Sequence, residues 1–284
     1  MKKLICCLLA IVIFTSIVPF GVLAENRKYS DLVVVAFGDS ITAADKWQKH
    51  LEKQFGMDII NAGISGDSTN SAMPRFKSAV LNREPDVVFI SLGTNDSAID
   101  MAKYVPIETY KANLTYFIDE CEKIGAKVII NIPPPVVDEI YLTRHDSTPF
   151  EPYGGPNGLV SLYAQAARDV ATEQGVFYTD LNAAFSATPD YTIYFPDGVH
   201  PSDTGYKLYA DTVAPVFQKL WLGDVNLDGT TDSMDYLLVK RAAFKTVTFT
   251  DEEFSRADVN GDQNIDYMDY LLVKRIGFKT YKVS

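Results

Sequence analysis

The sequence predicts an α/β protein: a parallel five-stranded sheet with helices on both faces, followed by a small all-helical tail with an internal duplication. Short continuous apolar runs alternate with amphipathic stretches through residues 32–220, which is typical of βαβ units with buried parallel strands. The segment 224–241 returns as 258–275 at an offset of 34 residues, which indicates two copies of one structural unit.

The predicted elements follow one another in a regular order along the large domain. Strands are expected at the continuous apolar runs, which cover residues 32–37, 58–61, 87–92, 127–132 and 176–179. Helices are expected at the amphipathic stretches, which cover about 46–55, 71–81, 106–124, 159–173 and 204–220. In open parallel sheets, ligands bind beyond the carboxyl ends of the strands, so polar residues there are the candidates for chemistry.

The first 24 residues have the composition of a secretory signal peptide. A basic start precedes an apolar run that ends in small residues, and we expect cleavage after Ala24. A membrane anchor is less favoured, because the run is short and is interrupted by Pro19. We therefore expect an extracellular protein with a signal peptide at 1–24, a large domain at 25–221 and a tail at 222–284.

Cleavage would remove Cys6 and Cys7 and would leave Cys121 as the only cysteine of the mature chain. An internal disulfide is then excluded, so the small tail needs another kind of cross-link. Cys121 lies between Glu120 and Glu122, and these acids should raise the pKa of its thiol. We therefore expect Cys121 to be a core residue and not a nucleophile.

The overall charge limits the classes of partner. The formal net charge is −11, from 26 basic and 37 acidic residues, and no basic stripe interrupts the acidic background. Such a chain is a poor ligand for nucleic acids or for anionic membranes. No segment after residue 24 is apolar enough to predict a membrane span.

Four polar motifs mark the predicted carboxyl edge of the sheet. Three of them follow consecutive strands, and the fourth precedes the last helix. They are Gly38-Asp39-Ser40, Gly63-Ile64-Ser65-Gly66, Gly93-Thr94-Asn95-Asp96 and Asp197-Gly198-Val199-His200. Each motif alone is a common turn or helix cap. Their joint occurrence at one edge of a sheet predicts an active site.

This set of motifs resembles the SGNH (GDSL-type) hydrolases, a family of esterases and lipases with a flavodoxin-like α/β fold. The resemblance covers residues 32–220 and includes all four motifs in order. It implies that Ser40 is the nucleophile, that Gly66 and Asn95 donate to the oxyanion, and that Asp197 and His200 complete the triad.

The residue chemistry agrees with that assignment. A serine hydroxyl attacks an ester only when a base removes its proton, and histidine is the usual base. His50 lies in a charged stretch and His145 in a long loop, whereas His200 follows Asp197 by three residues. The Gly-x-Ser-x-Gly elbow of α/β-hydrolases is missing around Ser40. We interpret the adjacent Asp39 as a hydrogen-bond acceptor that fixes the loop.

A long loop at residues 133–158 follows the fourth predicted strand and borders the same edge. Loops of this length are often functional. Its aromatic residues have two open interpretations: stacking on sugar rings, or packing of a lid. A metal site at His145 and Asp146 is a less favoured alternative.

The duplicated tail carries oxygen-bearing side chains at positions 1, 3, 5, 9 and 12 of two 12-residue loops, at 224–235 and 258–269. This is the spacing with which a short loop wraps a hard cation, as in calcium loops. Position 6 is Gly229 in the first loop and Gln263 in the second. Because that position requires a positive φ, we expect strain at Gln263, or a turn shared with Gly261, and a weaker second site.

The tail resembles a type I dockerin, a duplicated calcium module that binds a cohesin domain on a scaffold protein. The resemblance rests on the paired Asp-x-Asn-x-Asp loops and on the repeated helix Asp-Tyr-Leu-Leu-Val-Lys-Arg. It implies two structural calcium ions. The implied ligands are Asp224, Asn226, Asp228, Thr230 (through its carbonyl), Asp232 and Asp235 in the first loop, and Asp258, Asn260, Asp262, Asn264 (carbonyl), Asp266 and Asp269 in the second.

Together these features predict a secreted serine carboxyl-ester hydrolase of a cellulosome-like complex, with no cofactor for catalysis. The resemblance of the tail to a dockerin favours acetylated plant polysaccharide, such as acetylxylan or pectin, as the substrate. Two alternatives stay open: a lipase or lysophospholipase with the same triad, and a non-catalytic carbohydrate-binding or assembly protein. The preferred acyl chain length, acetyl or long-chain, distinguishes the first alternative from the main prediction. The intact set of four motifs argues against the second alternative.

Overall fold

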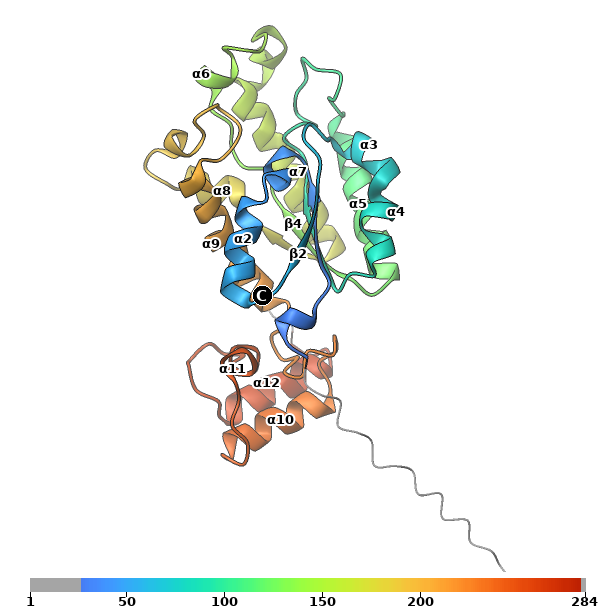
Figure 1. The fold of residues 1–284 in the computed structure, drawn as a ribbon, viewed down its shortest axis with the longest axis vertical. Coiled ribbons are helices and arrows are strands. Elements are labelled where there is room, and N and C mark those ends of the chain that lie inside the picture. The colour runs from blue at the N-terminus through green and yellow to red at the C-terminus, as the bar shows by residue number, and fades with distance from the viewer. Residues whose placement is uncertain (1–26, 282–284) are drawn as a thin grey trace, which may run out of the picture.

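The computed structural model describes residues 27–281. They form a large α/β domain and a smaller helical tail that lies at one end of it (Figure 1). The predicted signal peptide, with Cys6 and Cys7, lies outside the described residues, as do residues 282–284. Within the part that the structure describes, no helix is both long and apolar enough to span a bilayer.

The large domain is built on the predicted five-stranded parallel sheet. Its order is β2-β1-β3-β4-β5, the flavodoxin-like order, so the chain reverses direction across the sheet after β2. All four strand pairs are parallel. The strands are β1 (Val34–Gly38), β2 (Ile59–Gly63), β3 (Val87–Ser91), β4 (Lys127–Asn131) and β5 (Phe177–Thr179).

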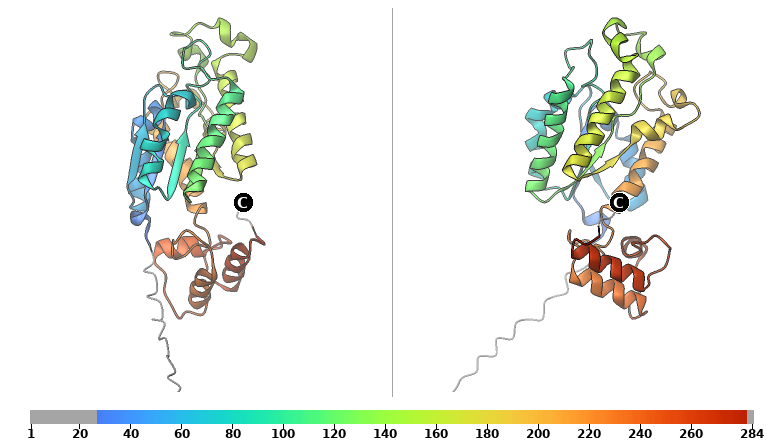
Figure 2. Two further views of the ribbon diagram at one scale, coloured as in Figure 1. Left: turned by 90° about the vertical axis from the view of Figure 1, so that its right-hand side faces the viewer. Right: turned by 180° about the vertical axis from the view of Figure 1, so that it is seen from behind.

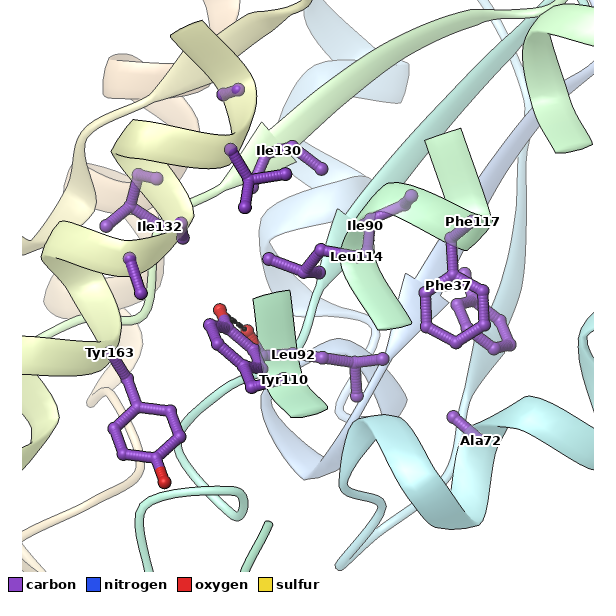
Figure 3. Close-up of a cluster of buried hydrophobic side chains, with 14 of the residues drawn as sticks. Phe37, Ala72, Ile90, Leu92, Tyr110, Leu114, Phe117, Ile130, Ile132 and Tyr163 are labelled. Atoms are coloured by element: carbon purple, nitrogen blue, oxygen red, sulfur yellow. Dashed lines mark hydrogen bonds between the residues drawn. The ribbon is translucent and has the colours of Figure 1, made fainter. Parts of the chain in front are cut away.

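Alternate residues of the strands enter two separate apolar cores, because successive side chains of a strand point to opposite faces. Phe37, Ile90 and Ile130 pack with α5 (Ile107–Lys123) and α7 (Pro156–Gln174) on one face, where the Tyr110 hydroxyl also donates to the Leu92 carbonyl at 3.0 Å (Figure 3). Ala36, Phe89 and Ile129 pack with α2 (Lys46–Phe55) and α9 (Asp203–Lys219) on the other. Helices therefore cover both faces of the sheet, as predicted (Figure 2).

The helices of the large domain agree with the main amphipathic stretches of the sequence. Short helices that were not predicted occur within the loops. The α-helices are α1 (Ser40–Ala43), α2 (Lys46–Phe55), α3 (Thr69–Ala72), α4 (Phe76–Ala79), α5 (Ile107–Lys123), α6 (Asp138–Tyr141), α7 (Pro156–Gln174), α8 (Leu181–Ser186) and α9 (Asp203–Lys219). The 3-10 helices are η1 (Tyr29–Asp31), η2 (Met73–Arg75), η3 (Leu81–Arg83), η4 (Thr148–Tyr153) and η5 (Tyr191–Tyr194).

The continuous helix expected at 71–81 is wrong. The segment is divided into α3, η2, α4 and η3. Pro74 has no N–H and lies in the 3-10 turn between α3 and α4, where an α-helical hydrogen bond would be lost. The apolar spacing of the segment is still used, since Ala72, Phe76 and Val80 are all buried against the sheet.

The tail contains α10 (Ser233–Ala243), α11 (Asp251–Ala257) and α12 (Tyr267–Gly277). The repeated Asp-Tyr-Leu-Leu-Val-Lys-Arg segments fall in α10 and α12, as predicted, and these two helices pack side by side (Figure 1). Their own core is small: Val225, Val239, Ala257, Val259 and Val273 are its buried members.

Candidate active site and cation-binding loops

Three polar residues from two distant parts of the chain meet beyond the carboxyl end of β1. Ser40 is the first residue of α1, directly beyond the end of β1. Its Oγ lies 2.8 Å from Nε2 of His200, which is 160 residues further along the chain. The other ring nitrogen, Nδ1 of His200, lies 2.7 Å from Oδ2 of Asp197. Serine, histidine and aspartate thus form one hydrogen-bonded chain.

Asp197 is held by the turn that carries it. Its Oδ1 accepts from the backbone N–H of His200 at 2.7 Å and of Val199 at 2.9 Å. Partial burial alone would raise the pKa of Asp197, but these bonds and the His200 ring outweigh it and lower the pKa. The carboxylate is therefore kept ionised beside the imidazole, as an orienting acid requires.

Ser40, Gly66, Asn95 and His200 line one cavity of about 300 Å³. The structure thus brings together four of the five residues predicted to be catalytic, and Asp197 lies behind His200. Gly66 has φ +84°, and a Cβ built there would meet nothing within 4 Å. The glycine therefore supplies a left-handed backbone that residues with a Cβ rarely adopt, and the space beside it is open.

The Asn95 side chain is fixed by contacts at both of its polar atoms. Nδ2 donates to the Asp67 carbonyl at 2.9 Å and has only a long contact, 3.4 Å, to Oδ2 of Asp39. Oδ1 accepts from Nζ of Lys103, which also lines the cavity. One amide hydrogen is thus committed to Asp67, and the other has only the long contact to Asp39, so it is the one available to a developing oxyanion.

Lys103 was not identified from the sequence, where it belongs to none of the four motifs. It is half-buried, and burial lowers the pKa of its ammonium group, while Asp39 and Asp100 oppose that effect. Its ammonium group therefore contacts Oδ1 of the candidate oxyanion donor Asn95, and its positive charge is attracted by the buried acid Asp39.

Asp39 has the role expected for it. Its Oδ1 accepts from the backbone N–H of Ile41 at 2.9 Å, which caps α1 and fixes Ser40. Burial raises the pKa of Asp39 to about 6. Asp96, the next residue after Asn95, is also buried, and burial raises the pKa of its carboxyl to about 7, although Thr69 donates to it.

Arg75 joins the loops after β1 and β2, and it too was missed. Its Nε donates to Asp67 at 2.7 Å, and its other nitrogens donate to the carbonyls of Ala62 at 2.7 Å and Gly38 at 3.1 Å. The guanidinium also lies over the ring of Phe37. A lone arginine in a broken helix gives no sequence signal for this role, which depends on the sheet order.

The loop at 133–158 forms one wall of the cavity through Tyr141, Arg144 and His145. The Tyr141 ring is buried and stacks on His145 with ring centroids 4.0 Å apart. Phe150 is also buried, which favours a packed lid over an open sugar platform. Nδ1 of His145 lies 2.7 Å from Asp100, so its partner is not the Asp146 of the less favoured metal site.

The two tail loops are closed by their own polar groups. In the first loop, Asp224 accepts from the backbone N–H groups of Asp228 and Gly229, and Asp235 accepts from those of Val225 and Asp232. The second loop repeats this pattern with Asp258 and Asp269. The predicted ligand positions of each loop therefore belong to one compact turn.

The donor set of these loops fits a hard cation, since it consists of oxygens alone. Burial, followed by repulsion from Asp235 and Asp228, raises the pKa of Asp224 to about 6, which a cation would reverse. Among residues 27–281, however, no three carboxylate, histidine or cysteine groups are gathered into a cation-binding cluster. The carboxylates bond to their own backbone instead.

Both loops have a left-handed backbone at two positions, the fourth and the sixth. The φ values are +58° at Leu227 and +98° at Gly229 in the first loop, and +74° at Gly261 and +65° at Gln263 in the second. The strain predicted at Gln263 is therefore present, at a cost of about 1–2 kcal/mol. Leu227 carries the same kind of strain in the first loop, so strain alone does not rank the two sites.

Two family models match separate parts of the chain. Residues 36–208 match the model of the GDSL-like Lipase/Acylhydrolase family, and residues 222–276 match the type I dockerin domain.

Two curated relatives illustrate the range of the similarity. An uncharacterized lipoprotein YqeF from Bacillus subtilis is 34% identical over 55% of this chain and 72% of its own length. An acetylxylan esterase from Geobacillus stearothermophilus is 25% identical over 55% of this chain and 70% of its own length. Among solved structures, a lipase/acylhydrolase from Enterococcus faecalis aligns with a TM-score of 0.55 and 27% identity, over 65% of this chain and 94% of its own.

Proposed function

This chain belongs to the GDSL-like lipase/acylhydrolase family, is a carboxylesterase and carries a type I dockerin domain, and from that premise we propose that it deacetylates plant cell-wall polysaccharide. The observation that carries the catalytic part is the hydrogen-bonded chain from Ser40 through His200 to Asp197, with spacings of 2.8 and 2.7 Å. The catalytic residues of the proposal are Ser40, Gly66, Asn95, Asp197 and His200.

In the proposed mechanism, Ser40 Oγ attacks the ester carbonyl carbon while Nε2 of His200 takes the hydroxyl proton. The C–O bond to the sugar then breaks, and Nε2 returns the proton to the departing sugar oxygen. A water molecule next attacks the acyl-serine while Nε2 of His200 takes its proton. The bond from the acyl carbon to Oγ then breaks, Nε2 returns the proton to Oγ of Ser40, and the acid is released. Asp197 stabilises the imidazolium form and fixes the ring in both halves of the reaction.

The tetrahedral intermediates carry a negative oxygen that needs fixed donors. We assign the backbone N–H groups of Ser40 and Gly66 and the Nδ2 amide of Asn95 to this role, each worth about 3 kcal/mol. Lys103 supports it as a positioning residue: it holds Oδ1 of Asn95, and its charge offsets that of the nearby Asp39.

A short acyl group is supported by the size and lining of the cavity. Its volume is about 300 Å³, at the lower end for small-molecule pockets, and its apolar lining consists of only a few side chains. The acetylxylan esterase from Geobacillus stearothermophilus, a family relative, supports an acetylated polysaccharide as substrate.

The tail is proposed to attach the enzyme to a cohesin domain of a scaffold, because type I dockerins imply cohesin binding. Calcium would be held by the six predicted oxygen ligands of each loop. When bound, it would neutralise the crowded carboxylates and cross-link each loop to the helix that follows. Exposed residues near the start of the two helices, Met234 in α10 and Tyr267 and Met268 in α12, are candidates for the contact with cohesin.

A dockerin implies work outside the cell, in a cellulosome. We therefore propose that residues 1–24 direct secretion, and that the boundary between the catalytic and dockerin domains lies between Trp221 and Leu222. Mass determination of the secreted protein tests the cleavage site after Ala24.

The function is tested by acetate release from acetylated xylan, from acetylated pectin and from 4-nitrophenyl acetate, with 4-nitrophenyl palmitate as the long-chain comparison. We expect turnover of acetyl esters and little of palmitate, and Ser40→Ala should abolish both. Preference for palmitate would favour the lipase alternative. Acetate release by Ser40→Ala equal to wild type would refute the assigned nucleophile.

A further inference from the structure

The first loop of the tail packs against the catalytic domain through one buried side chain. Leu227, at position 4 of that loop, is 0% exposed and belongs to the same apolar cluster as Tyr29, Phe217 and Trp221. The corresponding residue of the second loop is the exposed Gly261. One copy of the duplication thus has an apolar anchor that the other copy lacks.

Polar contacts surround this anchor. The backbone N–H of Arg27 donates to the Asn226 carbonyl at 3.0 Å, and Nζ of Lys127 donates to the Gly229 carbonyl at 3.4 Å. The Arg27 guanidinium is in turn paired with Asp86 at 2.9 Å. Asp86 precedes β3 and Lys127 opens β4, so the first loop lies at the amino ends of the strands, at the end of the large domain where Figure 1 shows the tail. The residues of the catalytic pocket follow the opposite, carboxyl ends of the strands.

A buried arginine completes the junction. Arg256 of α11 is 1% exposed, and its Nε and Nη2 donate to the Val225 carbonyl at 3.1 and 2.9 Å. Its guanidinium lies 5.3 Å from the ring centroid of Tyr29. The second loop has a different setting: it faces the end of α9 across an open groove of about 650 Å³.

Leu227 is also the strained residue of its loop, with φ +58°. A leucine is unfavourable in this region, so burial of its side chain must hold the turn. The same turn carries the proposed ligands Asn226 and Asp228 on either side of Leu227. Ordering the loop around an ion therefore orders the anchor, and docking of the anchor orders the ion site.

We propose that calcium binding at the first loop is linked to the stability of the catalytic domain through Leu227, and that the second loop has little part in this linkage. The inference rests on the proposed calcium sites. An ion that binds only the docked, folded loop stabilises whatever that loop is docked to. Linkage is reciprocal, so loss of docking should also alter calcium binding at the first loop.

The full chain offers a direct readout. Trp47 is buried inside the catalytic domain, so its fluorescence follows unfolding of that domain, whereas Trp221, which belongs to the same cluster as Leu227, also reports on the junction. In wild type, saturating calcium against excess EGTA should raise the Tm of this transition by about 3–5 °C. Asp224→Ala should abolish the shift, whereas Asp258→Ala, at the same position of the second loop, should keep it.

The anchor is tested with Leu227→Gly, which gives the first loop the residue that the second already has and relieves its strain. Calorimetric titration should count two ions in this variant, yet the calcium-dependent shift in Tm should be lost. Loss of only the first-loop ion would be the reciprocal effect of the same linkage. Leu271→Ala, at a leucine that is 43% exposed in α12, is the matched control and should keep the full shift.

Three results would overturn the proposal. The first is a calcium-dependent rise in Tm as large as that of wild type in a Leu227→Gly variant that still binds two ions. The second is a shift that depends on Asp258 and not on Asp224. The third is two bound ions without any shift in wild type. Binding of no ions by wild type would instead overturn the calcium sites themselves and would leave the esterase assignment untouched.

Discussion

The catalytic pocket and the tail loops both contain acidic side chains, but different contacts hold those side chains in place. In the pocket, partners come from elsewhere in the fold: Ser40 meets His200 across the sheet edge, and Asn95 donates to the carbonyl of Asp67. In the loops, Asp224 and Asp235 bond to the backbone of their own 12-residue turn. The comparison teaches that the sheet preorganises the pocket, whereas each loop depends on local turns and, we propose, on a cation.

The largest effect should come from removing the nucleophile of the preorganised site. Ser40→Ala should lower kcat for 4-nitrophenyl acetate by about 10⁴–10⁶-fold, because no other group is placed to form the acyl intermediate. The urea unfolding midpoint should stay close to that of wild type, since Ser40 supports no core packing. A large loss of stability would mean that the site is not independent of the fold.

Asn95→Ala should lower kcat by about 10²–10³-fold with a smaller change in KM, as expected of a donor that acts in the transition state.

Lys103→Met should lower kcat by a smaller factor, and Lys103→Arg should restore part of the loss. If Lys103 acts through the amide, Lys103→Met should add little in the Asn95→Ala background. Full additivity of the two losses would contradict a positioning role.

Removal of calcium should separate the two regions. Excess EGTA should reduce the helical circular dichroism of the tail, because the crowded carboxylates of each loop then repel one another. Turnover of 4-nitrophenyl acetate at 25 °C should be unchanged, because the catalytic residues lie at the carboxyl ends of the strands, away from both tail loops. Loss of turnover that calcium restores would show that the pocket is less independent than proposed.

The strained turn of the second loop allows a smaller test. Gln263→Gly should raise the calcium affinity of that loop by about five- to tenfold, since glycine adopts the left-handed backbone without cost. The matching change Gly229→Gln should lower the affinity of the first loop. Calorimetric titration of both variants measures the two effects, and no change in either would mean that these turns do not limit binding.

The buried acid that follows Asn95 provides the smallest expected effect. The folded pKa of Asp96, about 7, lies above its ordinary value of 3.8, so the folded state binds a proton that the unfolded state releases. Its contribution to stability is therefore fully present below pH 4 and is lost as the pH rises through 7. Asp96→Asn should flatten this part of the pH profile, as measured by urea midpoints from pH 4 to 8. An unchanged profile would argue against the raised pKa.

Strong local signals made much of the molecule predictable. Continuous apolar runs such as Val34–Gly38, in alternation with helical stretches, are typical of strands buried on both faces, and three of the four motifs mark the ends of such strands. The exception at 71–81 has a local cause as well, because Pro74 breaks the helix that the apolar spacing predicts.

The sequence by itself determined the fold class, the duplicated tail, and the presence of a serine, a histidine and an aspartate in the right motifs. Tertiary structure alone decided that Lys103 and Arg75 support these motifs, and that Leu227 anchors one loop while Gly261 leaves the other open. The physical reason is that periodicity and turn chemistry act over a few residues. A lone cation or a single buried leucine acquires its role only from the distant strands and helices that the fold brings to it.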